Sequence, residues 1–151
     1  MLIKTHLAIT LFFVLLLLPF VSHKVIFIIL AMLVTYVPDM DISSSKLGKF
    51  KIFRPIQFFI KHRGFFHSFT FLFLITIFFV MFIPILALGF FVGYASHLFA
   101  DSLTLNGIAP FSPWKRKTSG IIKTGGKTES MIFLFLLIAN LLLLSKYIFG
   151  S

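Results

Sequence analysis

The sequence holds only four acidic residues and five histidines, and most of them lie at the ends of apolar segments. His97 and Asp101 stand four residues apart in the apolar stretch GYASHLFADSL, so a helix places both on one face about 6 Å apart, with Thr104 following on that face. An aspartate inside an apolar helix costs several kcal/mol unless it is paired or bound to a metal. We therefore favour a functional site here over a structural His–Asp hydrogen bond between helices.

A second acidic motif ends the second apolar run. Asp39 and Asp41 lie in YVPDMDIS, where Pro38 and the turn after it are expected to direct both carboxylates outward. Alone, the motif is equally typical of an acidic turn that terminates a helix. In a chain with a net charge of +10, two neighbouring carboxylates are better explained by a bound cation. Carboxylate oxygens and imidazoles suit Zn, Mn, Fe or Mg.

The motif HRGFFHS at the start of the third apolar run adds two imidazoles. His62 and His67 bracket it, Arg63 offers a fork for phosphate or carboxylate, and Ser68 adds a hydroxyl. His67 already belongs to an apolar stretch, where an interfacial role explains it less well. His6 opens the first run and is interpreted equally well as an interfacial residue or as a ligand.

Together these side chains form one set of candidate metal ligands: His6, Asp39, Asp41, His62, His67, His97 and Asp101. The set is too large for one tetrahedral metal with an open position, which needs three protein ligands. It suits two ions that share a bridging carboxylate, activate water and clamp the oxygens of a phosphoester. Glu129 and Asp41 are the candidates for acid–base catalysis, although Glu129 also suits a helix N-terminus.

The composition indicates that membrane helices position these groups. Of 151 residues, 59% are hydrophobic and 12% are charged, and the mean hydropathy is +1.07. The 23 Phe alone outnumber the 14 Lys and Arg and 4 Asp and Glu combined, which excludes a soluble enzyme and a free nucleic-acid binder. The absence of Cys excludes disulfides, thiolate metal sites and a cysteine nucleophile.

The apolar runs set the expected number of membrane segments. They cover residues 7–21, 25–37, 65–103 and 131–149. As one helix the third run would reach about 60 Å, twice a hydrocarbon core of roughly 30 Å, so we expect two spans with a turn marked by Pro84 and Gly89. The chain is therefore expected to have about five segments. The first two runs are short for a full crossing, so they are expected to sit in thinned bilayer, to continue into their flanks or to be partly shielded by protein.

This topology places the N-terminus and the two long loops on one side. Of the 14 Lys and Arg, all except Lys24 and Lys146 fall on that side, a distribution that identifies it as cytoplasmic. Every acidic residue lies on the same side, and so does every histidine except His23. Residues 47–61 are expected to lie along the interface, with Phe and Ile toward the lipid and Lys and Arg toward water.

A site at the cytoplasmic ends of apolar helices suits a substrate with one part in the membrane, such as a lipid phosphoester. Membrane lipid and anionic headgroups are then the expected partners, nucleic acid is not, and the oligomeric state stays open. The basic residues after Trp114 suit either headgroup binding or topology-setting charge. The candidate substrate-binding residues are Arg63, Ser68, Thr104, Lys115, Arg116 and Lys117.

At these residues the sequence resembles the LexA-binding, inner-membrane-associated hydrolases, the YdjM-like family of small membrane-bound metal-dependent hydrolases. The resemblance covers most of the chain, through THLAIT, VPDMD, HRGFFHS, GYASHLFADSLTLNGIAPFSP and GGKTES, in that order. It implies hydrolysis without identifying a substrate. By this resemblance the functional set is His6, Asp39, Asp41, His62, His67, His97, Asp101 and Glu129.

The sequence thus predicts a single membrane-embedded hydrolase domain over residues 1–151. Its fold class is an all-α integral membrane protein of about five transmembrane or membrane-embedded helices, with a polar metal site at the cytoplasmic end. The expected cofactor is a divalent metal, in two ions, with Zn or Mn ahead of Fe or Mg. The alternatives are a metal-ion or proton transporter that uses the intramembrane His and Asp set, and a structural or regulatory membrane subunit.

Overall fold

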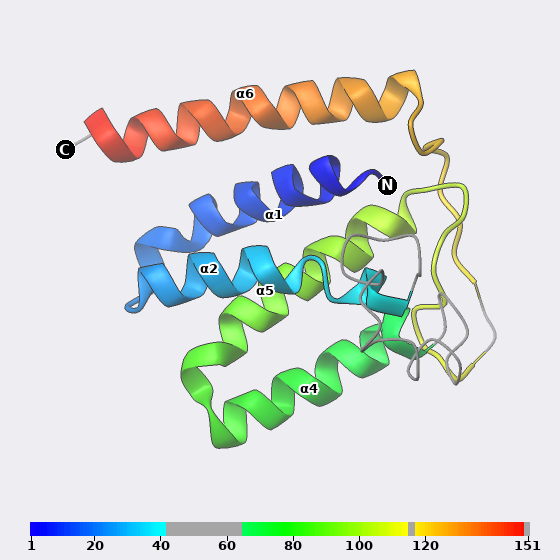
Figure 1. The fold of residues 1–151 in the computed structure, drawn as a ribbon, viewed down its shortest axis with the longest axis horizontal. Helices are drawn as coiled ribbons and strands as arrows, with labels where there is room; N and C mark the ends of the chain where they lie inside the picture. The colour runs from blue at the N-terminus through cyan, green and yellow to red at the C-terminus, as the bar shows by residue number, and fades with distance from the viewer. Residues whose placement is uncertain (42–64, 115–116, 150–151) are drawn as a thin grey trace.

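The computed structural model describes residues 1–41, 65–114 and 117–149, and its regular elements in these ranges are helical. A hydrocarbon environment favours helices, because each one satisfies its own backbone hydrogen bonds. The all-α fold class is confirmed for the described residues. Within these ranges the structure has five α-helices and three short 3-10 helices (Figure 1): α1 Ile3–Leu17, η1 Leu18–Phe20, α2 Lys24–Val34, η2 Pro38–Asp41, η4 Phe65–His67, α4 Phe69–Phe82, α5 Pro84–Ser102 and α6 Lys127–Phe149.

Three of these helices are long and apolar enough to cross a membrane, namely Ile3–Phe20, Pro84–Ser102 and Lys127–Phe149. The first apolar run continues into its flank, one of the expected alternatives, because its helix starts at Ile3, before the run, and together with η1 covers the 18 residues Ile3–Phe20. The short helices are α2, with 11 residues, and α4, with 14, which span about 17 and 21 Å.

The turn between α4 and α5 falls at Ile83 and Pro84. The predicted turn at Pro84 is confirmed. Pro84 is the first residue of α5, a position where the missing N–H of proline costs no hydrogen bond. Gly89, by contrast, lies inside α5, so the prediction that it marks the turn was wrong. A Cβ on Gly89 would lie 3.1 Å from the Leu30 side chain, and one on Gly93 would lie 2.3 Å from the Ala31 carbonyl oxygen. Both glycines therefore allow α2 to approach α5 closely.

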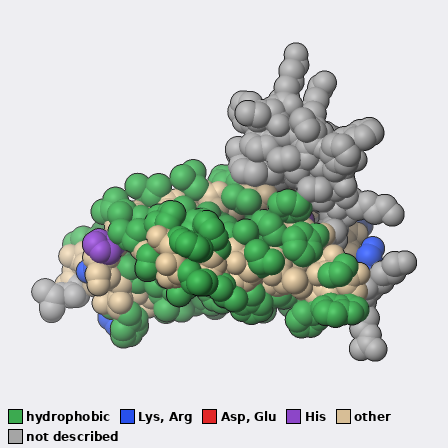
Figure 2. All heavy atoms as spheres, turned by 90° about the horizontal axis from the view of Figure 1, so that it is seen from below, with side chains coloured by type: hydrophobic (Ala, Val, Ile, Leu, Met, Phe, Trp, Pro, Cys, Tyr) green, Lys and Arg blue, Asp and Glu red, His purple; other side chains and the backbone are tan. Residues whose placement is uncertain are grey.

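Helix α5 lies at the centre of the bundle and packs against α1, α2 and α4, whereas α6 packs against α1. The core between the helices is apolar and includes Phe27, Ala31 and Val92 in one cluster and Leu72 and Tyr94 in another. The outer faces are apolar as well: Figure 2 shows hydrophobic side chains along the flank and basic ones only toward its ends. Such a surface suits contact with lipid.

The helices alternate in direction, so their ends fall into two groups at opposite ends of the bundle. The N-terminus, the end of α2, the start of α4, the end of α5 and the start of α6 lie at one end of the bundle (Figure 1). The start of α2, with His23, and the end of α6, with Lys146, lie at the other. The described acidic residues and the histidines other than His23 belong to the segments that meet at the first end, as predicted. The segment 47–61, expected to follow the interface, lies outside them.

Candidate metal centre

His97 and Asp101 lie on one face of α5, as their spacing predicts. The Nε2 atom of His97 is 3.8 Å from Oδ2 of Asp101. Both side chains are almost completely buried, at 0% and 3% relative exposure. An ionisable pair at this depth in an apolar bundle requires compensation by further charges or by a metal.

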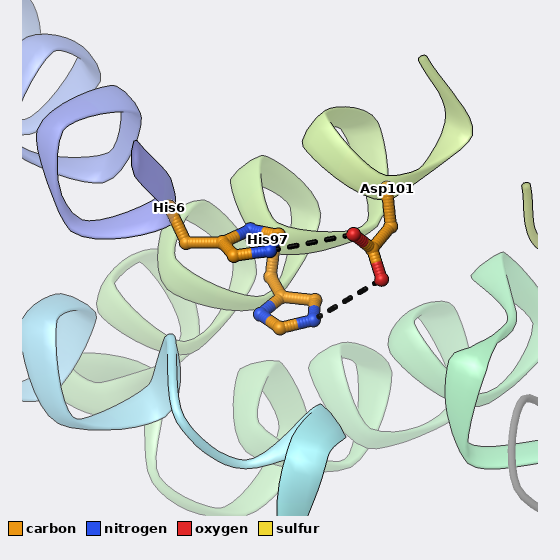
Figure 3. A group of neighbouring side chains, drawn as sticks. All are labelled: His6, His97 and Asp101. Atoms are coloured by element: carbon orange, nitrogen blue, oxygen red, sulfur yellow. Dashed lines mark ion pairs between the residues drawn. The ribbon is translucent and has the colours of Figure 1, made fainter. Parts of the chain in front are cut away.

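His6 reaches the same carboxylate from α1 (Figure 3). Its Nε2 atom lies 3.3 Å from Oδ1 of Asp101, and its ring stacks on His97 at 4.0 Å with an angle of 7° between the planes. The amino group of Met1 also contacts Oδ1 of Asp101, at 2.6 Å. The two oxygens of Asp101 thus face different imidazoles, Oδ1 that of His6 and Oδ2 that of His97.

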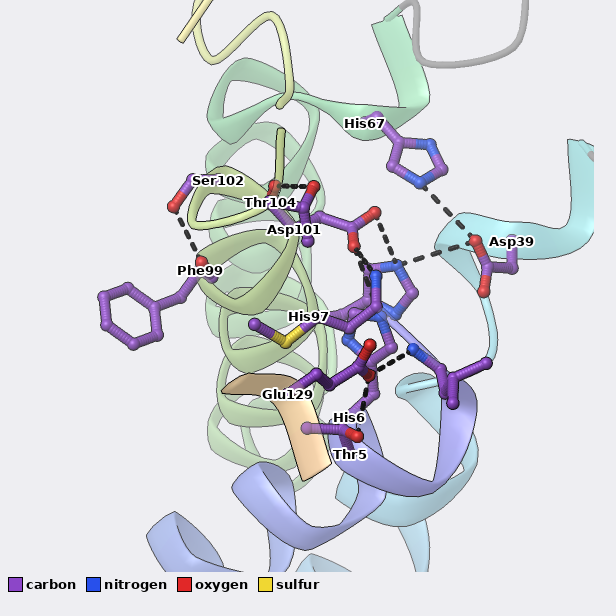
Figure 4. A network of polar contacts seen from close by, with 12 residues as sticks. Thr5, His6, Asp39, His67, His97, Phe99, Asp101, Ser102, Thr104 and Glu129 are labelled. Atoms are coloured by element: carbon purple, nitrogen blue, oxygen red, sulfur yellow. Dashed lines mark hydrogen bonds and ion pairs between the residues drawn. The ribbon is translucent and has the colours of Figure 1, made fainter. Parts of the chain in front are cut away.

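A second group approaches His97 from the opposite side (Figure 4). Oδ1 of Asp39 in η2 lies 3.7 Å from Nε2 of His67 in η4 and 3.7 Å from Nε2 of His97. Asp39 is therefore turned toward the imidazoles, which corrects the expectation that it projects outward. Burial acts to raise the pKa of Asp39, but the imidazoles of His67 and His97 outweigh burial and hold the pKa below its ordinary value.

The hydrogen bond at the other ring nitrogen of His97 determines what this imidazole can bind. Its Nδ1 lies 2.8 Å from the backbone carbonyl oxygen of Thr35, which only accepts, so Nδ1 carries the proton and donates it. The lone pair is then on Nε2, which is buried without a hydrogen-bond partner among the described residues. A backbone carbonyl that orients an imidazole in this way is typical of metal-ligating histidines.

The distances and donor types fit a divalent cation. Two donors bound at about 2.1 Å to one tetrahedral ion lie about 3.4 Å apart, close to the separations between Nε2 of His97 and its carboxylate neighbours. Nδ1 of His6 is a second buried nitrogen that lacks a hydrogen bond within the described ranges. The candidate ligand atoms form two sets, and within each set they lie no more than 4.8 Å apart. The sets are His6, His97 and Asp101, and Asp39, His67 and His97. Imidazole with carboxylate favours Zn, Mn or Fe over Mg.

The remaining candidate residues divide into those with local roles and those outside the description. Thr104 is buried, and its hydroxyl donates to the carbonyl oxygen of Asp101. The Ser68 hydroxyl caps α4 by accepting from the Phe71 N–H and donating to the Phe65 carbonyl. Lys117 is exposed. Outside the described residues lie His62, Arg63, Lys115 and Arg116, together with the side chain of Asp41.

Glu129 lies beside His6 and Thr5 but belongs to neither ligand group (Figure 4). Its Oε1 accepts hydrogen bonds from the Leu2 N–H at 2.6 Å and the Thr5 hydroxyl at 2.8 Å. Its Oε2 accepts from the Gly125 N–H at 2.6 Å. The carboxylate thus ties the start of α1 to the start of α6, and general-base catalysis by Glu129 stays a prediction.

We expect Glu129→Gln to destabilise the protein without releasing metal. An amide nitrogen cannot accept the hydrogen bond from Gly125, and hydrogen bonds to charged groups contribute about 1.5–3 kcal/mol each. Thermal unfolding in detergent should therefore occur several degrees lower, with unchanged metal content. A loss of turnover of about 100-fold or more at unchanged stability would instead assign Glu129 the role of general base.

The sequence did not single out a buried hydroxyl cluster formed by Thr10, Thr35 and Ser96. The Thr10 hydroxyl lies 2.9 Å from that of Thr35 and 2.7 Å from that of Ser96. A signal was present, because Thr10 follows His6 by one helical turn and Ser96 directly precedes His97. The contact between His97 and the Thr35 carbonyl had no such signal, since every residue has a backbone carbonyl.

Comparison with known proteins identifies a family. The family model described as YdjM inner membrane protein matches residues 1–150, nearly the whole chain. No curated protein and no solved structure matches the chain.

Proposed function

The chain belongs to the YdjM inner membrane protein family, and we propose that it is a membrane-bound metal-dependent hydrolase. Its proposed substrate is a phosphoester, or a related ester, of a lipid or membrane-associated molecule. The observation that carries the proposal is Nε2 of His97, a buried nitrogen that lacks a hydrogen bond among the described residues and lies 3.7 and 3.8 Å from two carboxylate oxygens. A nitrogen so placed is ready to bind a cation.

The two ligand groups share His97, and this limits how two ions can be held. Its Nδ1 proton is engaged with Thr35, so the ring has one lone pair, on Nε2, for one ion. In the proposed centre His97 would hold one ion together with Asp39 and His67. His6 would hold the second ion, and Asp101, whose oxygens face the imidazoles of His6 and His97, would be the ligand that the two ions share. Such ions, with Zn or Mn the first choice, would activate water and polarise the ester oxygen.

The position of the site supports a substrate that is partly embedded in lipid. The ligands lie at the end of the bundle that holds the N-terminus, the end of α5 and the start of α6, and the helices that carry them present apolar outer faces. Four described lysines belong to the segments of that end: Lys4 at the start of α1, Lys127 at the start of α6, and Lys117 and Lys123 between α5 and α6. We propose that this end is cytoplasmic, by the positive-inside rule, and that Lys117 with Arg63, Lys115 and Arg116 attracts the anionic headgroup.

Ester hydrolysis by the protein purified in detergent tests the proposal. Mixed micelles of phosphatidic acid, lysophosphatidic acid and phosphatidylglycerol offer phosphomonoester, phosphodiester and carboxylic ester bonds. We expect turnover of at least one of these lipids, abolished by chelator and restored when Mn²⁺ or Zn²⁺ is added back. If none is cleaved with either ion, and proteoliposomes of the same protein carry a metal-ion or proton flux, the transporter interpretation replaces the hydrolase.

A further inference from the structure

We propose that Thr10, Thr35 and Ser96 act as positioning residues for the metal ligands, an inference that rests on the proposed metal centre. Their hydroxyls meet where α1, α5 and the end of α2 come together, and all three side chains are buried at 3% exposure or less. A hydroxyl in an apolar bundle has no water as an alternative partner, so hydrogen bonds between helices fix the relative position of the helices.

Each hydroxyl belongs to a segment that also carries a candidate ligand. Thr10 lies one helical turn after His6 on α1, and Ser96 directly precedes His97 on α5. Thr35 contributes two atoms. Its hydroxyl belongs to the cluster, and its carbonyl oxygen accepts the hydrogen bond that the Nδ1–H of His97 donates, at 2.8 Å. A change in the cluster is therefore transmitted directly to the tautomer and orientation of His97.

Thr10 is the member that depends entirely on the other helices. The Thr35 hydroxyl also contacts the Ala31 carbonyl at 2.8 Å, and the Ser96 hydroxyl contacts the Val92 carbonyl at 2.7 Å. Within the described residues the Thr10 hydroxyl contacts no backbone carbonyl, and its two partners lie on α5 and at the end of α2. Because a hydroxyl has one hydrogen, Thr10 donates to only one of these two partners while both donate to their own helix. Removing the Thr10 hydroxyl takes away both contacts from α1, and Thr35 and Ser96 keep their backbone partners.

Helix α1 depends more on the hydroxyl cluster for its position than α2 does, because α2 already packs closely against α5. Gly93 lies against the Ala31 backbone, which holds α2 and α5 together through direct contact below the cluster. His6, by contrast, must meet Asp101 from α1, with a stacking distance to His97 of 4.0 Å that a small shift of α1 would disturb. Thr10 thus sets where His6 lies relative to the ligands on α5.

Cobalt binding to the full chain in detergent tests this inference, because Co²⁺ reports both affinity and ligand geometry through its visible absorption. We expect Thr10→Val, which keeps the side-chain shape, to weaken Co²⁺ binding about tenfold or more and to alter the spectrum. Thr10→Ser, which keeps the hydroxyl, should restore both. Thr76→Val is the matched control, because the Thr76 hydroxyl bonds only within α4, to the Leu72 carbonyl at 2.7 Å. The metal-free melting temperatures of both valine variants should be similar.

Three results would overturn the inference. The first is wild-type Co²⁺ affinity and spectrum in Thr10→Val. The second is a lowered metal-free melting temperature in Thr10→Val with unchanged Co²⁺ affinity, which would make the cluster purely structural. The third is a failure of Thr10→Ser to restore binding. If Thr10→Val does not fold, Ser96→Ala removes one of its two partners and should weaken Co²⁺ binding several-fold. Absence of Co²⁺ binding by the wild type would instead refute the metal centre itself.

Discussion

Asp101→Asn is expected to reduce bound metal to background and to abolish hydrolysis. Asp101 is the carboxylate that contacts both His6 and His97, and its buried charge offsets the charge of a divalent ion. An amide of the same shape removes that charge and leaves one neutral oxygen donor, so both ion positions lose their shared ligand. The measurement is metal content by inductively coupled plasma mass spectrometry, together with turnover of the lipid ester that the wild type cleaves.

Ser102→Ala is the matched control for this substitution. It alters the adjacent residue of the same helix, which is half-buried and whose hydroxyl, among the described residues, donates to the Phe99 carbonyl. Metal content and turnover should remain at wild-type levels in this variant. Full metal occupancy in Asp101→Asn, with a folded protein, would exclude the bridging role of Asp101.

Replacing His97 should remove more metal than replacing His67 or His6. His97 belongs to both groups of clustered donors, whereas His67 and His6 belong to one group each. His97→Ala removes the Nε2 ligand of one ion and also the ring on which His6, the ligand of the second ion, stacks at 4.0 Å, so it disturbs both ion positions. His67→Ala leaves His6, His97 and Asp101 in place. We expect metal content at background in His97→Ala and about half of the wild-type value in His67→Ala and in His6→Ala.

His23→Ala serves as the control for these imidazole substitutions, because His23 is exposed at the opposite end of the bundle. It should bind as much metal as the wild type. An equal loss in His23→Ala would mean that the histidine substitutions act through general unfolding. A smaller loss in His97→Ala than in His67→Ala would contradict the shared role of His97.

Much of the candidate site could be predicted because helical periodicity and topology act on particular residues. The spacing of His97 and Asp101 placed them on one face, and alternation of the spans brought His6, Asp39 and His67 to the same end. What could not be predicted is how these groups pair. Whether Asp39 points inward depends on the turn after α2, and the partner of His97 is a backbone atom that leaves no trace in residue type.

The fold shows a similar division. Pro84 marked the start of α5, because its ring permits only a few helix positions. The turn predicted at Gly89 was wrong, because a glycine in an apolar segment can allow close helix packing as well as a turn. Of the alternatives for the short first run, the structure has continuation into the flank, since a helix can include polar residues such as Lys4 and His6 when those side chains find partners.

The metal content of the wild-type protein, purified in detergent without chelator, tests the metal centre most directly. Inductively coupled plasma mass spectrometry on the full chain should find about two equivalents of a transition metal per chain, Zn or Mn in the first place. The proposed centre would be contradicted if the purified protein contained no stoichiometric Zn, Mn or Fe and also took up none of these metals when they were added.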